Sequence, residues 1–337
     1  MECCVLRRTN NIDTRGNNFM NIAPDFCPLC QGSLNISLET GNVFGDKSKV
    51  RSFYHCGSCD VFFQWPRLTV DEESTFYRDE FEKFMESRND QGGMDWSGPE
   101  RHVQSNSDQR NRRERYLKPY YERASRGKSP HLLEVGCSSG FMMAGLEAEY
   151  GITPVGIEPS GSFAKYLRSQ GYQVFQSIDD HLQNSDQDQY DLITNYFVLE
   201  HIQEPFDFCR RLFGLLKPGG SLIMEVPNAA DPLRTVYETQ SFKDFYWSIA
   251  HPWYFTRKSL SFLLQSSLPG ATAEIFSDQR YDIGNHVRWL KDGRPGGQGK
   301  LAEIFDSEFN SHFRRCLIQS DRCDTLVAVV TKDLEKK

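Results

Sequence analysis

The chain has 337 residues, a length that predicts one or two domains of ordinary size. Hydrophobic residues make up 38% and charged residues 25%, a composition that can bury a core and that excludes collagen-like and broadly disordered chains. Acidic residues outnumber basic ones by 46 to 39, and the resulting charge of -7 argues against a nucleic-acid substrate.

The chain has no apolar run of the roughly 20 residues that a bilayer span needs. Its first residues, MECCVLRRTNNIDTRG, lack the apolar centre of a signal peptide. We therefore expect a cytoplasmic protein without a membrane partner. Residues 1–23 are polar and irregular and are expected to form a flexible tail, with Met20 as an alternative start.

Two Cys-x-x-Cys pairs define the first organised segment, which we place at residues 24–68. Each tight turn can deliver two thiolates to one ion, and four thiolates complete the tetrahedron that Zn²⁺ prefers. Such a site has no open position for water, so the sequence predicts a structural zinc ribbon. The alternatives are free or disulfide-bonded cysteines, or His55 as a substitute ligand. The four predicted ligands are Cys27, Cys30, Cys56 and Cys59.

Residues 69–128 form a charged segment that we expect to be a helical bridge. Residues 110–121 contain good helix formers, and we expect a helix there. That helix should end near Pro119, because proline interrupts a helix. The same portion includes a basic run, RNRRERYLK. A basic face on such a helix is usually solvated.

From residue 131 onward, short apolar runs alternate with helical patterns. This alternation predicts right-handed βαβ units and a parallel sheet covered on both faces. We expect strands at 131–135, 153–157, 172–175, 190–194 and 221–226, and helices at 141–150, 163–170 and 205–216. A turn is expected at 217–220, and further elements at 259–265 (helix), 272–276 and 326–331 (strands).

A glycine-bearing turn follows the first of these strands and ends at Gly140. About twenty residues later the second strand ends in Glu158, where an acid can accept both ribose hydroxyls of a nucleoside. The dinucleotide fingerprint G-x-G-x-x-G fails, because Ser138 and Phe141 occupy two of its glycine positions. A nucleoside cofactor without a pyrophosphate is therefore favoured over NAD.

The segments LLEVGCSSG, VGIEPS, YDLITNYFVLEHIQEP and LLKPGGSLIMEVPN together resemble class I S-adenosylmethionine-dependent methyltransferases. With CPLC, CGSC and HPWYFT, the chain is similar to the subgroup that has an N-terminal zinc-binding domain, common among bacterial sugar and natural-product methyltransferases. The resemblance covers most of 24–268. It implies a Rossmann-like α/β fold with a mostly parallel seven-stranded sheet. We place this domain at 129–337, with a cap inserted at 228–258 and 280–323, although 280–323 contains no family element.

The resemblance also implies which residues bind S-adenosylmethionine. The first motif would surround the methionine part, Glu158 would bind the ribose, and residues after the third strand would flank adenine. Ser138 departs from the glycine that the family commonly has there. The implied cofactor residues are Glu134, Gly136, Cys137, Ser138, Ser139, Gly140, Glu158, Ile178, Asp179, Asn195 and Tyr196.

Methyl transfer to a hydroxyl requires removal of a proton, a role that suits histidine. His251 and His201 are the candidate bases, with Glu225 as a carboxylate that could orient the base. Sugar C-methyltransferases of the subgroup have a Tyr-x-Glu-His run where this chain has Ser248, Ile249 and Ala250 before the histidine. We therefore expect O-methylation of a small molecule, a sugar or nucleotide-linked sugar.

Three alternatives remain open at this stage. The chain could be a sugar C-methyltransferase, an RNA methyltransferase that holds nucleic acid with its zinc unit, or a non-catalytic cofactor-binding scaffold. An aromatic cluster near His251 could stack on a sugar, cover a pocket or pack on itself: Phe242, Phe245, Tyr246, Trp247, Trp253, Tyr254 and Phe255. The sequence does not define the oligomeric state.

Overall fold

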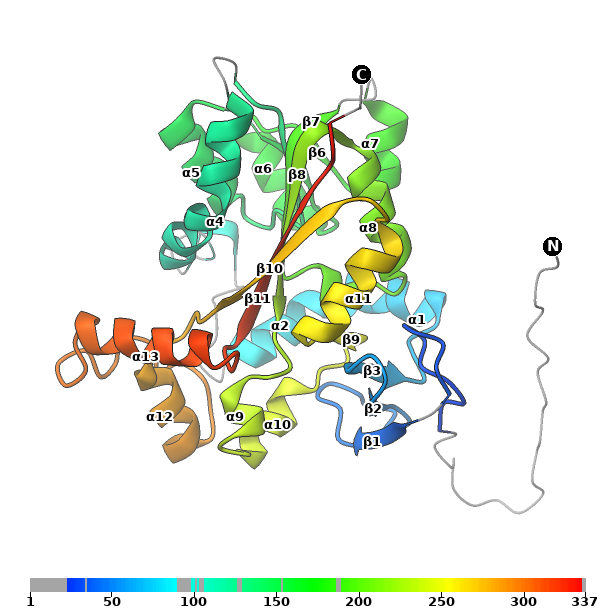
Figure 1. The fold of residues 1–337 in the computed structure, drawn as a ribbon, viewed down its shortest axis with the longest axis vertical. Helices are drawn as coiled ribbons and strands as arrows, with labels where there is room; N and C mark the ends of the chain where they lie inside the picture. The colour runs from blue at the N-terminus through cyan, green and yellow to red at the C-terminus, as the bar shows by residue number, and fades with distance from the viewer. Residues whose placement is uncertain are drawn as a thin grey trace.

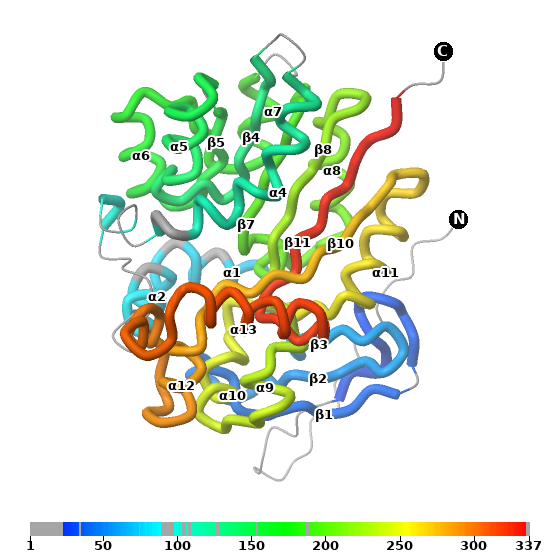
Figure 2. Tube along the Cα trace, turned by 60° about the vertical axis from the view of Figure 1, so that its left-hand side comes forward, coloured from blue at the N-terminus to red at the C-terminus, as the bar shows by residue number. Residues whose placement is uncertain are grey.

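The structure is a computed structural model that describes residues 23–33, 35–89, 98–100, 102, 106–125, 129–152, 154–185 and 189–334. Residues 1–22 of the expected tail, Met20 included, lie outside the described residues. Figures 1 and 2 show an upper lobe built on a large sheet and a lower lobe that contains the cysteine-rich segment, with α1 and α2 lying between them.

The large sheet has seven strands in the order β10-β11-β8-β7-β4-β5-β6. Strands β4 to β8 run parallel, while β11 runs antiparallel to both of its neighbours, which confirms the predicted mostly parallel sheet. Its strands are β4 (Leu132–Val135), β5 (Val155–Ile157), β6 (Val174–Phe175), β7 (Tyr190–Tyr196), β8 (Leu216–Pro227), β10 (Thr272–Asp278) and β11 (Thr325–Thr331).

Helices cover both faces of this sheet because the strands alternate their apolar side chains between two faces. On one face, Leu222 belongs to the core that contains residues of α8 and α11; on the other, Ile223 packs with Leu117 of α4 and Leu146 of α5. The helices of this lobe are α4 (Ser107–Ser125), α5 (Phe141–Tyr150), α6 (Gly161–Ser169), α7 (Ile178–Asn184), α8 (Pro205–Gly214) and α11 (Arg257–Ser267).

The cysteine-rich segment forms a second, four-stranded antiparallel sheet that it does not complete by itself. Its own strands are β1 (Ile36–Thr40), β2 (Ser52–Cys56) and β3 (Val61–Trp65). The fourth, β9 (Trp253–Tyr254), comes from the expected cap and pairs with Phe62 and Phe63 of β3. The small sheet therefore extends beyond the boundary expected at residue 68, because one of its strands comes from residues 253–254.

The remaining helices surround these two sheets. The bridge contributes α1 (Val70–Thr75), the π-helix η1 (Phe76–Glu80) and α2 (Phe81–Asn89), and a 3-10 helix, η2 (Leu199–His201), follows β7. The segments expected to form the cap contain α9 (Pro232–Thr235), α10 (Gln240–Tyr246), α12 (Ile283–Asp292) and α13 (Ser307–Gln319).

The aromatic cluster near His251 is a core, not an exposed face. Trp247, Trp253 and Tyr254 are each 1% exposed, and Trp247 packs against Phe53 and Phe62 of the small sheet. These rings thus join the cap to the cysteine-rich sheet by burying aromatic surface. Buried as they are, they do not offer faces for a sugar to stack on.

Two predicted boundaries are wrong. Helix α4 continues through Pro119 to Ser125, because its side chains pack on the sheet: Leu117 is fully buried and outweighs one missing backbone hydrogen bond. The turn expected at 217–220 lies inside β8, where the register against β7 shifts between Tyr190 and Leu192. That bulge accommodates Gly219, whose φ is 80°.

Candidate active site and cysteine cluster

The four predicted zinc ligands meet at one point. Cys27 Sγ lies 3.7 Å from Cys59 Sγ, and Cys30 Sγ lies 3.7 Å from Cys56 Sγ. All four sulfur atoms lie within 4.8 Å of one another. Zinc–sulfur bonds of about 2.3 Å arranged as a tetrahedron give sulfur–sulfur distances of roughly 3.8 Å. The cluster therefore fits a tetrahedral metal, whereas its sulfur atoms are too far apart for disulfides.

His55 is not at this cluster. Its Nε2 lies 2.8 Å from Asp60 Oδ1, and its ring stacks on Phe62. A histidine on a strand next to a cysteine points to the opposite face of the sheet from that cysteine. His55 therefore does not replace a cysteine ligand.

The topology brings the predicted cofactor residues to one edge of the large sheet. The chain runs from β4 outward to β6 and then returns to β7 on the other side of β4. Ligands of open α/β sheets bind at such a switch point, beyond the carboxyl ends of the strands. Here those ends are followed by the glycine-bearing turn, Glu158, η2 and Asn228.

The glycine-bearing turn needs its glycines for two reasons. Gly136 and Gly140 have φ values of 72° and 73°, which favour glycine over residues with a side chain. A Cβ atom at Gly136 would lie 2.4 Å from Val198, and one at Gly140 would lie 2.4 Å from Leu167. Ser138, the departure from the family pattern, has a φ of 51° and donates its backbone N–H to Glu158 at 2.7 Å.

Glu158 is positioned by this turn and by the start of α6. Its carboxylate accepts hydrogen bonds from the backbone N–H groups of Ser138, at 2.7 Å, and Ser160, at 2.8 Å. Burial raises the pKa of Glu158 to about 7, and the two backbone donors oppose that rise. A carboxylate at a strand end with its geometry fixed in this way is suited to accept hydrogen bonds from hydroxyl groups.

Other predicted cofactor residues present buried polar atoms without a partner among the described residues. They include Glu134 Oε2, both side-chain amide atoms of Asn195 and the hydroxyl of Tyr196. Burial also raises the pKa of Glu134 to about 8. Because a buried polar group without a hydrogen bond is costly, these atoms fit a site that a polar ligand completes. This is the observation on which the S-adenosylmethionine assignment rests.

The predicted adenine-flanking residues, Ile178 and Asp179, do not belong to this group of buried polar atoms. Ile178 begins α7, which Ser177 caps, and the carboxylate of Asp179 forms an ion pair with Arg211 of α8. The Asp179 side chain is 69% exposed. Cys137 and Ser139, by contrast, are buried within the turn.

The two candidate bases come together from different segments. The rings of His201, in η2, and His251, before β9, lie 4.5 Å apart edge to face. Burial, with a contribution from Arg88, lowers the pKa of His201 to about 4 and that of His251 well below its usual value. Both imidazoles are therefore neutral at neutral pH, which is the form that accepts a proton.

Hydrogen bonds fix the tautomer of each ring. His201 Nδ1 lies 2.8 Å from the carbonyl of Ala250, which only accepts, so Nδ1 bears the proton. Tyr254 directs its own hydroxyl proton to the carbonyl of Tyr246, so its oxygen accepts from His251 Nδ1 at 3.0 Å. Each histidine consequently has its lone pair on Nε2.

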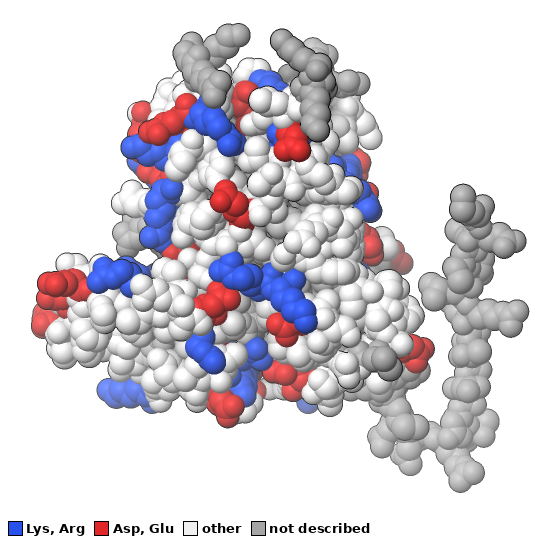
Figure 3. Space-filling model, viewed as in Figure 1, with Lys and Arg blue, Asp and Glu red and all other residues white. Residues whose placement is uncertain are grey.

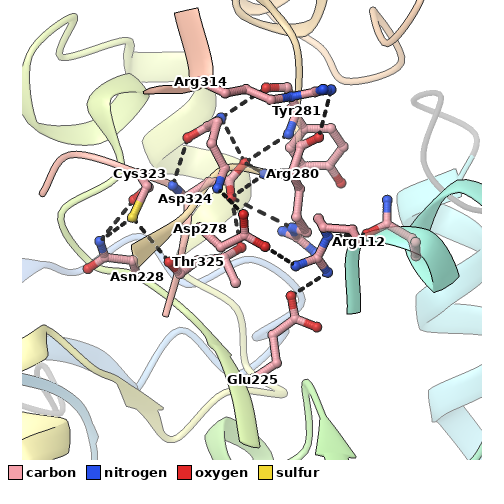
Figure 4. A network of polar contacts seen from close by, with 12 residues as sticks. Arg112, Glu225, Asn228, Asp278, Arg280, Tyr281, Arg314, Cys323, Asp324 and Thr325 are labelled. Atoms are coloured by element: carbon pink, nitrogen blue, oxygen red, sulfur yellow. Dashed lines mark hydrogen bonds and ion pairs between the residues drawn. The ribbon is translucent and has the colours of Figure 1, made fainter. Parts of the chain in front are cut away.

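The prediction that Glu225 orients a histidine is wrong. The carboxylate is fully buried and forms ion pairs with Arg112 and Arg113 of α4, and these arginines lower its pKa although burial opposes the shift. Figure 4 shows Arg112 between Glu225 of β8 and Asp278 of β10. The groups that orient the histidines are Tyr254 and the Ala250 carbonyl instead.

The same arginines correct the interpretation of the basic run in the bridge. The side chains of Arg112 and Arg113 are 9% and 7% exposed, so they attach α4 to the ends of two strands and are not solvated. Arg113 also lies 4.2 Å from the ring of Tyr196. On the face in Figure 3, basic and acidic side chains are interspersed, without the continuous basic surface that nucleic acid needs.

Two residues of the site, Glu200 and His102, were not predicted from the sequence. Glu200, beside His201, is 1% exposed, and burial raises its pKa to about 8. His102 is buried over the glycine-bearing turn, with its Nδ1 2.7 Å from Ser139 Oγ. Glu200 could have been found from its place in VLEHI, whereas nothing near His102 in the sequence points to the turn.

Residues 109–267 match the family model described as a methyltransferase domain. A ubiquinone biosynthesis O-methyltransferase of Coxiella burnetii (strain Dugway 5J108-111) is 29% identical over 114 residues, which are 32% of this chain and 48% of the relative. The chain thus spans about half the length of the curated relatives it matches.

Two solved structures of methyltransferases are similar to this chain. An S-adenosylmethionine-dependent methyltransferase from Archaeoglobus fulgidus has a TM-score of 0.43 at 17% identity, over 66% of this chain and 92% of that one. The plantazolicin methyltransferase BamL, in complex with a triazolic analog and S-adenosylhomocysteine, has a TM-score of 0.49 at 15% identity, over 77% and 94%.

The family match and the strand order confirm the predicted class. The chain carries a class I S-adenosylmethionine-dependent methyltransferase domain. A cysteine cluster able to bind a metal lies beside this domain. In the described part of the chain, none of the helices has the length and apolar content that crossing a bilayer would require.

Proposed function

We propose that this protein transfers the methyl group of S-adenosylmethionine to a hydroxyl group of a small molecule. The observation that carries the proposal is the half-buried pair of neutral histidines, His201 and His251, each with Nδ1 bound and Nε2 available. His201 follows β7, which lies next to the strand that bears the glycine turn, and His251 lies between β8, the other neighbour of β7, and β9. When bound, the cofactor supplies an electrophilic methyl group on a sulfonium.

Different residues of this chain would then bind the cofactor and remove the proton of the acceptor. Glu158 would hold the ribose, while Glu134 and Asn195 would satisfy the polar end of the methionine part. The acceptor hydroxyl would lose its proton at the histidine pair as its oxygen attacks the methyl carbon. Glu225 stays outside this step, because its charge is already balanced by Arg112 and Arg113.

A sugar or nucleotide-linked sugar is the narrower acceptor hypothesis. The buried aromatic rings do not support it, so the class of acceptor rests on the hydroxyl chemistry alone. A panel of phenols, sugars and nucleotide sugars, assayed for formation of S-adenosylhomocysteine, tests the proposed O-methylation and the narrower sugar hypothesis. Turnover of phenols only would contradict the sugar hypothesis, and a methylated carbon in the product would contradict O-methylation.

Cofactor binding should strengthen as pH rises from 6 to 8. Burial holds the pKa of free Glu158 at about 7, and only the carboxylate accepts both ribose hydroxyls. Raising the pH ionises the group before binding, so the affinity for S-adenosylhomocysteine should increase roughly tenfold over these two units. Calorimetry at several pH values measures this dependence, and Glu158→Gln should flatten it.

We also propose that the cysteine cluster binds one structural zinc ion. The purified protein should contain about one zinc per chain, and Cys27→Ser should lose it, because the ion needs four protein ligands. The variant should also unfold at a lower temperature, since metal binding contributes to folding. Elemental analysis and thermal unfolding measure both effects.

Cys316→Ser is the matched control for the zinc experiment. This cysteine is exposed on α13, outside the cluster, so its replacement should leave the zinc content and the unfolding temperature unchanged. Full zinc content in Cys27→Ser would contradict the assignment of that ligand.

A further inference from the structure

A second group of metal-ligand side chains lies at the histidine pair. Glu200, His201 and His251 each offer one ligand atom, and these atoms all lie within 4.8 Å of one another. Glu200 and His201 are neighbours in η2, and His251 reaches them from the segment before β9. Two imidazoles and one carboxylate form a donor set that divalent metal ions accept.

The histidines of this group are arranged as metal ligands usually are. A ligating histidine directs one ring N–H to an oxygen acceptor, and this contact leaves the other nitrogen for the ion. His201 does so with the carbonyl of Ala250, and His251 does so with the hydroxyl of Tyr254. The two Nε2 atoms are therefore oriented by partners that belong to the backbone and to the buried aromatic core.

The carboxylate supplies a reason for an ion to bind there. Glu200 is 1% exposed, and its Oε2 has no hydrogen-bond partner among the described residues. A buried carboxylate without a partner is unfavourable, and a cation would resolve it.

We propose that Glu200, His201 and His251 bind one divalent cation in the acceptor site. This inference rests on the proposed function and deepens it: the two Nε2 atoms hold the ion, so the ion, and not a histidine lone pair, activates the acceptor hydroxyl. With three protein ligands the ion keeps positions open for the acceptor oxygen, whose proton it makes easier to remove. The proton leaves to solvent, the oxygen–methyl bond forms, the carbon–sulfur bond breaks, and the sulfur retains its electron pair in S-adenosylhomocysteine.

Titration with Mn²⁺, followed by loss of the free-ion signal in electron paramagnetic resonance, tests the site directly. Mn²⁺ suits carboxylate and imidazole ligands and does not compete well for four thiolates, so zinc in the cysteine cluster does not interfere. We expect one Mn²⁺ per chain. Affinity should fall at least about tenfold in Glu200→Gln and in His251→Asn, because each removes one ligand.

The matched controls are Glu204→Gln and His312→Asn. Glu204 lies on the same segment as Glu200 but its side chain is 80% exposed, and His312 lies on α13 away from the group. Both should bind Mn²⁺ as the unmodified protein does. Thermal unfolding and S-adenosylhomocysteine binding show that each variant is folded; should His251→Asn fail this check, Glu200→Gln, which preserves shape, decides the result.

The outcomes separate this inference from the proposed function. Absence of stoichiometric Mn²⁺ binding to the unmodified protein, or undiminished binding to folded Glu200→Gln, overturns the metal site. If S-adenosylhomocysteine still binds in that case, the methyltransferase proposal stands and the histidines act directly on the acceptor. If Mn²⁺ binds but S-adenosylhomocysteine does not, the proposed function fails instead.

Discussion

Replacement of Glu158 by alanine is expected to weaken S-adenosylhomocysteine binding by roughly 100-fold or more, because two charge-assisted hydrogen bonds of about 1.5–3 kcal/mol each are lost. The effect should be large because the carboxylate is fixed in advance by the N–H groups of Ser138 and Ser160. Isothermal titration calorimetry measures the change. An affinity equal to that of the unmodified protein would remove Glu158 from the cofactor site.

Two further variants make this experiment specific. Glu158→Gln keeps one acceptor oxygen and should lose less affinity than the alanine variant, which separates hydrogen bonding from a general change of the turn. Glu147→Ala removes an acid from the exposed side of α5, where Tyr172 is its partner, and should leave binding unchanged. Thermal unfolding of all three variants controls for loss of structure.

Replacement of His251 by alanine is expected to lower kcat by about 10²- to 10⁴-fold, the range typical for a group that assists proton removal. Cofactor binding should persist, because the described hydrogen bond of the His251 ring goes to Tyr254 and not to the glycine-bearing turn. The assay is S-adenosylhomocysteine formation with the best acceptor of the panel, compared with calorimetry on the same preparation.

The separation of kcat from cofactor affinity is what distinguishes this role from a structural one. His251 also donates to Tyr254, so the alanine variant removes a hydrogen bond from the aromatic core. His251→Asn offers a polar replacement, and His312→Ala changes an exposed histidine on α13. Unchanged kcat in a folded His251 variant would leave His201 as the remaining candidate.

Much of the methyltransferase lobe could be predicted from the sequence. Short apolar runs alternating with helical patterns indicate a parallel sheet, since only buried strands and their covering helices have this periodicity. The glycine-bearing turn and Glu158 were found for a similar reason, because a close backbone approach and an acid at a strand end are local requirements. Likewise, the spacing within each cysteine pair is a local property of a tight turn.

Residues whose role depends on distant partners could not be assigned in this way. Arg112 and Arg113 look like part of a solvated basic run, yet both are buried against Glu225, more than a hundred residues later in the chain. Glu225 in turn looked like a spare carboxylate. A charge pattern in sequence states which groups are ionisable, but burial and pairing determine whether they serve stability or chemistry.

The sequence by itself determined the class of the domain, the glycine-bearing turn after β4 and the four cysteines of the cluster, because local backbone requirements specify each of them. Only the tertiary structure decided how the segments meet. It completed the cysteine-rich sheet with β9, buried the aromatic cluster between the two parts, and brought Glu200, His201 and His251 to one point. Contacts between segments fifty or more residues apart depend on the packing of the whole chain, and no local pattern encodes them.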